Sequence, residues 1–113
     1  MADYQEKTVN GTSWKRCRSI YIDNPRPHLG APSVQFNEER VVSFEGVELV
    51  SPDGMLTEGF TPDNALTEFN LLHPDTGAVL GTATFTDAYV MLASLYRHLA
   101  EKRDAAAALA ATE

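Results

Sequence analysis

The segment Asp23–Pro32, DNPRPHLGAP, places three prolines and a glycine within ten residues. Proline lacks a backbone donor and biases the preceding residue toward extended geometry, so this segment suits neither a helix nor a central strand. It therefore predicts a linker, which ends an N-terminal arm at residues 1–32. We expect one domain over residues 33–106 and an alanine-rich tail over residues 107–113, because 113 residues leave no room for a second core.

Residues 33–85 have the pattern of short strands separated by turns. Apolar residues alternate with polar ones from Val34, and Pro and Asp occur together with Gly or Asn at 51–54, 61–64 and 73–77. We predict turns at these three clusters, and the last, His73–Gly77, should close a hairpin between residues 69–72 and 78–80. The pattern predicts a small, mostly antiparallel β-sheet.

A single helix is predicted after the strands. Thr86 can cap it, and Asp87 in its first turn favours the positive end of the helix dipole. An apolar stripe should face the sheet at helical spacing, and it consists of Ala88, Leu92, Leu95 and Leu99. Alanines extend the pattern beyond Arg103, but this end has little to bury and should fray. The expected fold class is α+β: a small, mostly antiparallel sheet followed by one C-terminal amphipathic helix, with an extended N-terminal arm.

Charge is unevenly distributed along the chain. The formal net charge is −7, and a chain this acidic repels phosphate backbones, which argues against nucleic acid as a partner. Residues 1–30 carry five bases and three acids, whereas residues 31–85 carry nine acids and one base. This asymmetry suggests head-to-tail contact between copies or docking on an acidic partner. The alternative is a solvated surface with no partner.

The sequence indicates no enzyme, cofactor or metal. The histidines, His28, His73 and His98, are scattered, and Cys17 is the single cysteine, so the spacing of a metal site is absent. Glu38 with Glu39 could supply paired carboxylates, as could Glu45 with Glu48, but such alternation more often marks a solvated strand face. We predict no catalytic, cofactor-binding or metal residues and no small-molecule substrate. The N-terminus lacks a signal-peptide core and no apolar run is long enough for a membrane span, so no membrane partner is expected.

Two segments contain residues that predict protein–protein contacts. The predicted helix is apolar or amphipathic well outside its main stripe, which indicates that a partner chain covers a second face. In the arm, alternation places an aromatic, two arginines and two isoleucines on one face, suited either to an edge strand or to a segment lying across another surface. We expect the arm to be unstructured alone and to order on a neighbouring subunit. The predicted interaction residues are Trp14, Arg16, Arg18, Ile20, Ile22, Tyr89, Met91 and Tyr96.

Three stretches, SIYIDNPRP, APSVQFNEERVV and NLLHPDTGAVLGTATFTDAYVMLASLYRHLAEKRDAA, span about residues 19–106. Together they resemble small structural proteins of tailed bacteriophages. The resemblance implies a non-enzymatic virion component, assembled in the bacterial cytoplasm and repeated in a tail, baseplate or neck. Its partners would be other virion proteins and copies of itself. The alternatives are a cytoplasmic protein-binding module, such as an inhibitor or assembly chaperone, and a capsid decoration protein.

Overall fold

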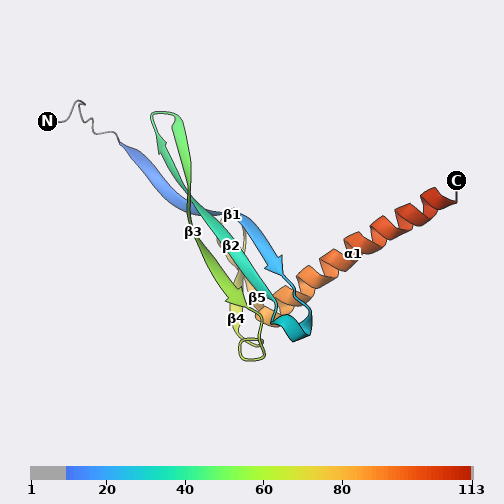
Figure 1. Cartoon of the computed structure of the whole chain (residues 1–113). Helices are drawn as coiled ribbons and strands as arrows, with labels where there is room; N and C mark the ends of the chain where they lie inside the picture. The colour runs from blue at the N-terminus through green and yellow to red at the C-terminus, as the bar shows by residue number, and fades with distance from the viewer. Residues whose placement is uncertain (1–9, 113) are drawn as a thin grey trace. The chain divides into compact units, whose positions relative to one another are not determined.

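The computed structural model describes residues 10–112 and confirms the predicted α+β class, with two small antiparallel sheets and one C-terminal helix (Figure 1). The chain divides into two compact units, Met1–Gly59 and Phe60–Glu113. The single domain predicted over residues 33–106 includes parts of both units.

The first unit is a three-stranded antiparallel sheet in the order β1–β2–β3. Its strands are β1 (Gly11–Asp23), β2 (Ser33–Phe44) and β3 (Val47–Gly59), so that β2 is central and the other two are edges. The proline-rich segment joins β1 to β2 and contains one short 3-10 helix, η1 (Pro27–Leu29), closed by a 2.8 Å hydrogen bond from the Leu29 amide to the Arg26 carbonyl.

Strand β1 differs from the expectation of an arm that is unstructured in the isolated chain. It pairs with β2 along its whole length, from Gly11 opposite Phe44 to Asp23 opposite Ser33. Of the two forms considered from the sequence, the structure shows the edge strand. The prolines do not release this segment from the body; they turn the chain so that β1 and β2 run antiparallel. The expectation for residues 1–9 lies outside the described residues.

Strands β2 and β3 form a long hairpin. Glu45 and Gly46 make its two-residue loop, and both have positive φ, 48° and 76°, as the type I′ turn of a tight hairpin requires. The predicted turn at Ser51–Gly54 is wrong, because β3 runs through these residues. Their turn-forming character instead produces an irregularity in the pairing between Asn37 and Glu39, where Gly54 takes φ 91°. Pro52 lies beside this irregularity on an edge strand, which is where strands tolerate proline.

The second unit begins with a hairpin of β4 (Glu68–Leu72) and β5 (Val79–Thr84). The predicted turn at His73–Gly77 is confirmed. The His73 amide donates to the Ala78 carbonyl, and the Gly77 amide donates to the His73 carbonyl, both at 2.8 Å. The His73 ring helps to fix the turn, since its Nδ1 accepts a 3.1 Å hydrogen bond from the Asp75 amide.

Helix α1 (Phe85–Ala111) follows β5 directly. Its N-cap is Thr84 and not the predicted Thr86. The Thr84 hydroxyl accepts from the Asp87 amide at 3.1 Å, and the Asp87 carboxylate accepts from the Thr84 amide at 2.9 Å, which together form a capping box. Thr86 instead donates its hydroxyl to the Ala65 carbonyl at 3.0 Å. The helix continues to Ala111, through most of the tail that was expected to fray.

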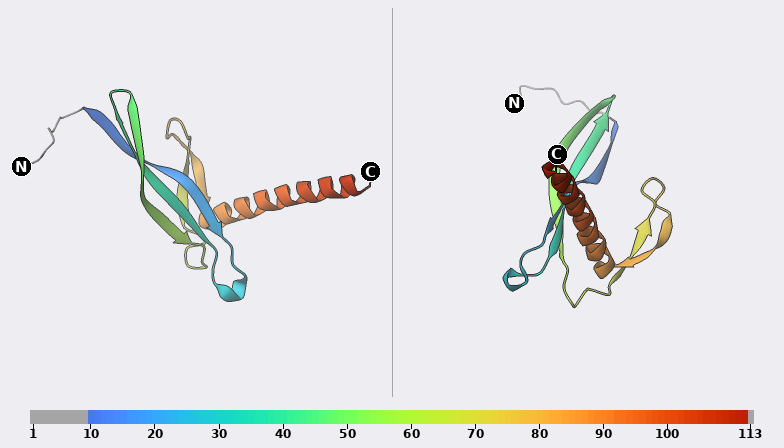
Figure 2. Two further views of the ribbon diagram at one scale, coloured as in Figure 1. Left: turned by 45° about the horizontal axis from the view of Figure 1, so that its top comes forward. Right: turned by 90° about the vertical axis from the view of Figure 1, so that its right-hand side faces the viewer.

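Very little of the described chain is buried. Its buried apolar side chains are Val34 and Val41, 7% and 4% exposed. No residue of α1 is buried, and the stripe predicted to face the sheet is open to solvent, with Leu95 54% exposed. Within the second unit, the predicted packing of this stripe against a sheet is therefore not seen. The strands divide into two separate sheets, and within its unit α1 mainly contacts β5, at the start of the helix (Figure 2).

Candidate interaction surfaces

The two faces of the first sheet are set by a bulge at Arg18. The β1–β2 register shifts between Cys17 and Ser19, so Arg18 is an extra residue and the alternation of β1 reverses there. Trp14 and Arg16 pair with Val41 and Glu39, whereas Ile20 and Ile22 pair with Phe36 and Val34. Paired residues of an antiparallel ladder share a face. The expectation that these β1 residues share one face is therefore wrong: Trp14 and Arg16 lie on one face, and Ile20 and Ile22 on the other.

Each face has an apolar cluster defined by cross-strand pairing. On the first face, Val41 lies between Trp14 and Val50, and we call these three residues the tryptophan cluster. On the opposite face lies the isoleucine cluster, which consists of Ile20, Ile22, Val34, Phe36 and Leu56. In both clusters a residue of central β2 is buried, while the edge-strand members Trp14, Val50, Ile20 and Leu56 are exposed. Each cluster thus provides one apolar layer, and within this unit no second layer covers it.

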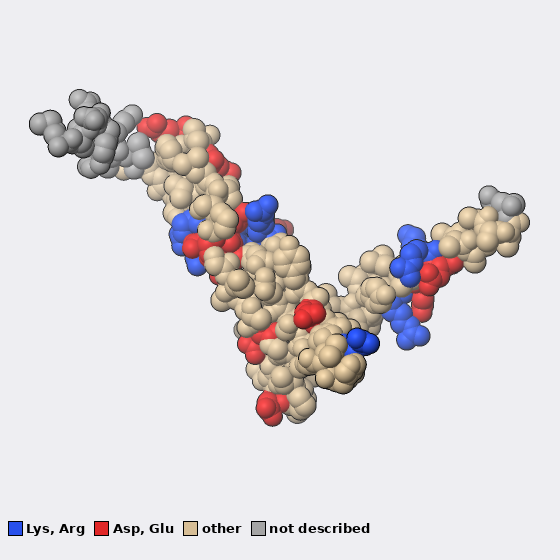
Figure 3. Space-filling model, in the orientation of Figure 1, with Lys and Arg blue, Asp and Glu red and all other residues tan. Residues whose placement is uncertain are grey.

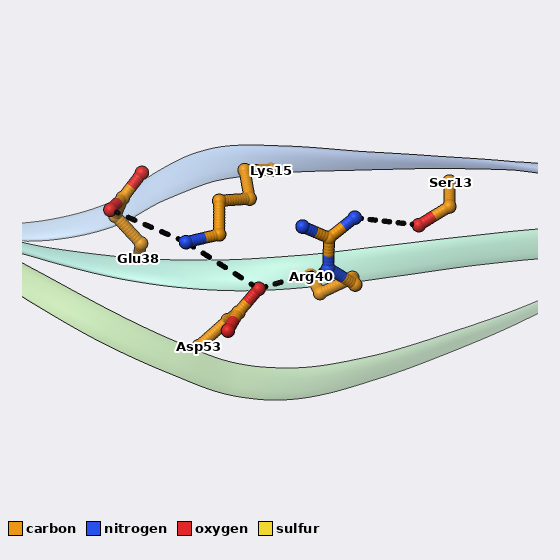
Figure 4. A network of polar contacts seen from close by, with 5 residues as sticks. All are labelled: Ser13, Lys15, Glu38, Arg40 and Asp53. Atoms are coloured by element: carbon orange, nitrogen blue, oxygen red, sulfur yellow. Dashed lines mark hydrogen bonds and ion pairs between the residues drawn. The ribbon is translucent and has the colours of Figure 1, made fainter.

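A polar network crosses all three strands on the face of the isoleucine cluster (Figure 4). Arg40 on β2 donates from Nε to Asp53 Oδ2 on β3 at 2.9 Å and from a terminal nitrogen to Ser13 Oγ on β1 at 2.9 Å. Lys15 Nζ lies 3.7 Å from the same Asp53 oxygen and 3.9 Å from Glu38 Oε1. Two cations and two anions therefore neutralise each other across the sheet. Figure 3 shows blue and red side chains close together midway along this sheet.

A second ion pair ties β1 to β2 on the opposite face. Arg16 on β1 donates to Glu39 Oε1 on β2, its direct neighbour in the register. Glu39 is the buried charged residue of the described chain. Successive strand residues point to opposite faces, so Glu38 and Glu39, considered from the sequence as a carboxylate pair, point apart. Each faces a cation instead.

Asp53 is the one described side chain whose pKa is clearly displaced. The hydrogen bond from Arg40 is the main cause, and Lys15 adds to it, so that the pKa of this carboxyl is held below its ordinary value of 3.8. Both partners favour the charged form. Protonation of Asp53 in acid therefore weakens its contacts with Arg40 and Lys15.

Rings gather where α1 meets its hairpin in the second unit. Phe85 lies edge-on to Phe60 and to Phe69, with ring centroids 6.4 and 6.0 Å apart. Tyr89 lies 5.4 Å from Phe60. Edge-to-face contacts of this length are favourable for aromatic rings. Tyr89, predicted from the sequence as an interaction residue, is thus engaged within its own unit.

The remaining predicted interaction residues of the helix are exposed. Met91 and Tyr96 are both about two-thirds exposed, beside the open leucines of α1. Arg18 is also exposed, at the bulge of β1. The sequence analysis missed the apolar residues of β3, among them Val50 and Leu56. The sequence contains a signal for them: β3 has apolar residues at both odd and even positions, and this pattern predicts a strand that is apolar on both faces.

The described residues offer little for chemistry. In residues 10–112, no three His, Cys, Asp or Glu side chains lie together in a way that could hold a metal ion. Cys17 is exposed, and its Sγ lies 3.5 Å from the Ser19 carbonyl oxygen. None of the described helices combines the length and apolarity needed to span a membrane.

Comparison with known proteins identifies no relative of this chain: no family model, no curated protein and no solved structure matches it.

Proposed function

We propose that this chain is a non-enzymatic structural component of a larger assembly, in which neighbouring protein chains cover its two units. One observation carries the proposal. The two buried apolar side chains of the described chain, Val34 and Val41, lie on opposite faces of the same strand. A stable domain needs at least two packed layers around a common core. Neither face of β2 has a second layer within its unit, so each face is suited to receive one from a partner.

The exposed apolar surface supports this reading. Large apolar side chains are open to solvent along β1, β3, β4, β5 and α1. Single exposed apolar residues are ordinary, but contiguous ones mark contact sites. Here the register joins them into the tryptophan and isoleucine clusters, and helical spacing joins them along α1. The chain therefore joins its assembly through protein contacts at β1 and at α1.

Copies of the same chain are favoured as partners by the charges of the two edge strands. Strand β1 carries three bases and one acid, whereas β3 carries three acids and no base. Lys15, Arg16 and Asp53 form ion pairs within the sheet. The attraction between edges therefore comes from Arg18 on β1 and Glu48 on β3. Both strands are edges of the described three-stranded sheet, and edge strands favour pairing with another strand. Placing the basic edge of one copy against the acidic edge of the next gives a head-to-tail contact, and such a contact generates rings or filaments. Opposite charges steer it and suppress the like-edge alternatives.

The resemblance to small structural proteins of tailed phages gives the setting: a virion, and within it the tail, baseplate or neck. The test uses particles released from cells that carry this gene. They would be purified on a density gradient, washed with concentrated salt and analysed by immunoblot and quantitative mass spectrometry. We expect the chain to remain with the particles at a fixed ratio to the other structural proteins.

Recovery of the chain only among free proteins would overturn the virion setting. If that free chain were in a fixed-ratio complex with one soluble protein, the cytoplasmic binding module would take its place. Release of the chain from otherwise intact particles by the salt wash would instead indicate a capsid decoration protein.

A further inference from the structure

We propose that α1 is a self-association helix, packed in a parallel bundle with α1 of at least two other copies of this chain. This inference rests on the proposed function. It names the partner of one surface, the exposed face of α1, as two or more further copies of the same chain. The first turns of α1 contact other residues of the second unit through Phe85 and Tyr89. The structure leaves the rest of the helix open to such contacts, because no residue of Phe85–Ala111 is buried.

The spacing of side chains along α1 is that of a coiled coil. Seam positions of a coiled coil recur at alternating intervals of three and four residues and are apolar. In α1 this spacing holds over the whole helix, and apart from one lysine every seam residue is apolar. The seam consists of Phe85, Ala88, Leu92, Leu95, Leu99, Lys102, Ala106 and Leu109. A stripe that only packs on a sheet within its own chain has no need of this regularity over so many turns.

The outer positions of the helix contrast with the seam. They contain most of its charges, and the ion pair between Arg97 and Glu101, 3.1 Å apart, lies outside the seam. Val90 is the one large apolar residue of α1 at an outer position. The helix therefore has one face for solvent and one for other helices.

The apolar face is too broad for a single neighbour. The positions that flank the seam include Met91, Tyr96, Ala105 and Ala110 beside the polar His98 and Arg103, so the apolar arc is wider than the seam itself. A two-stranded coiled coil covers mainly the seam, whereas apolar residues that flank the seam are covered when a helix has a neighbour on each side. This wider arc is the reason for inferring three or more copies.

A parallel arrangement suits the order of the side chains. It places identical residues in common layers, with Leu92, Leu95 and Leu99 together in the N-terminal half. The alanines come together in the C-terminal half, where Lys102 also forms one layer whose long side chains can extend to solvent. An antiparallel arrangement would instead set Lys102 against Leu92 of the neighbour. A single polar seam residue also fixes the register of such a bundle.

The first test measures mass in solution by sedimentation velocity. We expect the full chain to have at least three times the single-chain mass of 12.4 kDa. The seam variant, Leu95→Asp with Leu99→Asp, should have the single-chain mass at the same concentration, with its dissociation constant raised at least 100-fold. The control, Ser94→Asp with Ala107→Asp, adds the same charge at outer positions and should keep the wild-type mass. A wild type that is a monomer or a dimer overturns the inference, as does a seam variant that associates normally.

The second test requires no destabilised variant. In a Cys17→Ser background, Leu109→Cys should form disulfide-linked chains on oxidation, whereas Ala108→Cys, one residue away on the outer face, should not. In a parallel bundle, copies of residue 109 meet at the same level. In an antiparallel one they lie up to about 36 Å apart, far beyond the reach of a disulfide. Absence of a crosslink in the Leu109→Cys variant overturns the parallel arrangement.

The two proposals can fail separately. A chain that is monomeric in solution but fixed in purified particles would refute self-association and leave the structural role intact. A chain that forms the bundle but is absent from particles would retain self-association and refute the virion setting.

Discussion

Replacing Leu95 by alanine should destabilise the chain by an amount that depends on protein concentration. The substitution removes three carbon atoms, each worth about 0.8 kcal/mol when fully buried. Leu95 is 54% exposed in the single chain, so less than half of that total is at stake, and we expect a loss of about 1 kcal/mol in the dilute monomer. In the assembled helix bundle the side chain is fully covered and a cavity is left behind, which raises the expected loss to about 2–5 kcal/mol per copy.

The assay is urea unfolding followed by circular dichroism, at one concentration below and one above the association range found by sedimentation. Val90→Ala provides the matched control, because Val90 is also 54% exposed but lies on the outer face of α1. Its effect should be small and the same at both concentrations. The difference between the two variants isolates the contribution of the seam.

Two results would refute the reasoning. An equal, small loss for Leu95→Ala at both concentrations would show that nothing covers the seam in the associated protein. A loss above about 2 kcal/mol in the dilute monomer would show that Leu95 already packs within its own chain.

Three further predictions concern the local devices of the two units. Deleting Arg18 should place Trp14 and Arg16 on the wrong face and leave buried Glu39 unpaired. The free energy of unfolding, measured in urea, should fall by about 3 kcal/mol or more. Arg18→Ala should change this free energy by less than about 0.5 kcal/mol. Asp53 stabilises the fold only while charged, and its pKa is lowered on folding, so this contribution is complete above about pH 4 and is lost as the pH falls below 3.8; acid titration of Asp53→Asn should lack that component. Thr84→Ala should lower the free energy of unfolding by about 0.5–2 kcal/mol because it removes the N-cap, whereas Thr84→Ser keeps the hydroxyl and should lose much less. An equally large loss in Thr84→Ser would argue against the capping box.

The local elements were largely predictable from the sequence, because their signals are local. The hairpin at His73–Gly77 follows from proline near its start and glycine at its end, and the helix follows from its apolar spacing. The cap was misplaced by two residues, since Thr84 and Thr86 are both good caps. Only Thr84 has an acidic residue, Asp87, at the third helical position, which makes a capping box with it possible.

The pairing of strands was not predictable in the same way. Ser51–Gly54 has the composition of a turn, but β3 pairs with β2 on both sides of this segment. The segment therefore forms an irregularity within the strand and not a turn. The bulge at Arg18 has no local signature at all, and one extra residue sends Ile20 and Ile22 to the face opposite Trp14. The candidate surface was therefore predicted in its residues but not in its arrangement.

The charges of the first sheet explain how a partner can cover it. Burying a charge is costly unless the charge is already paired. Within the network, Lys15 and Arg40 balance Glu38 and Asp53, and on the other face Arg16 balances Glu39. Both sets are neutral within the chain, so the net charge of −7 arises from other residues. A partner layer therefore need not supply counter-charges on either face. It needs only apolar side chains that fit the tryptophan and isoleucine clusters, while the charged edges of β1 and β3 determine which strand lies beside which.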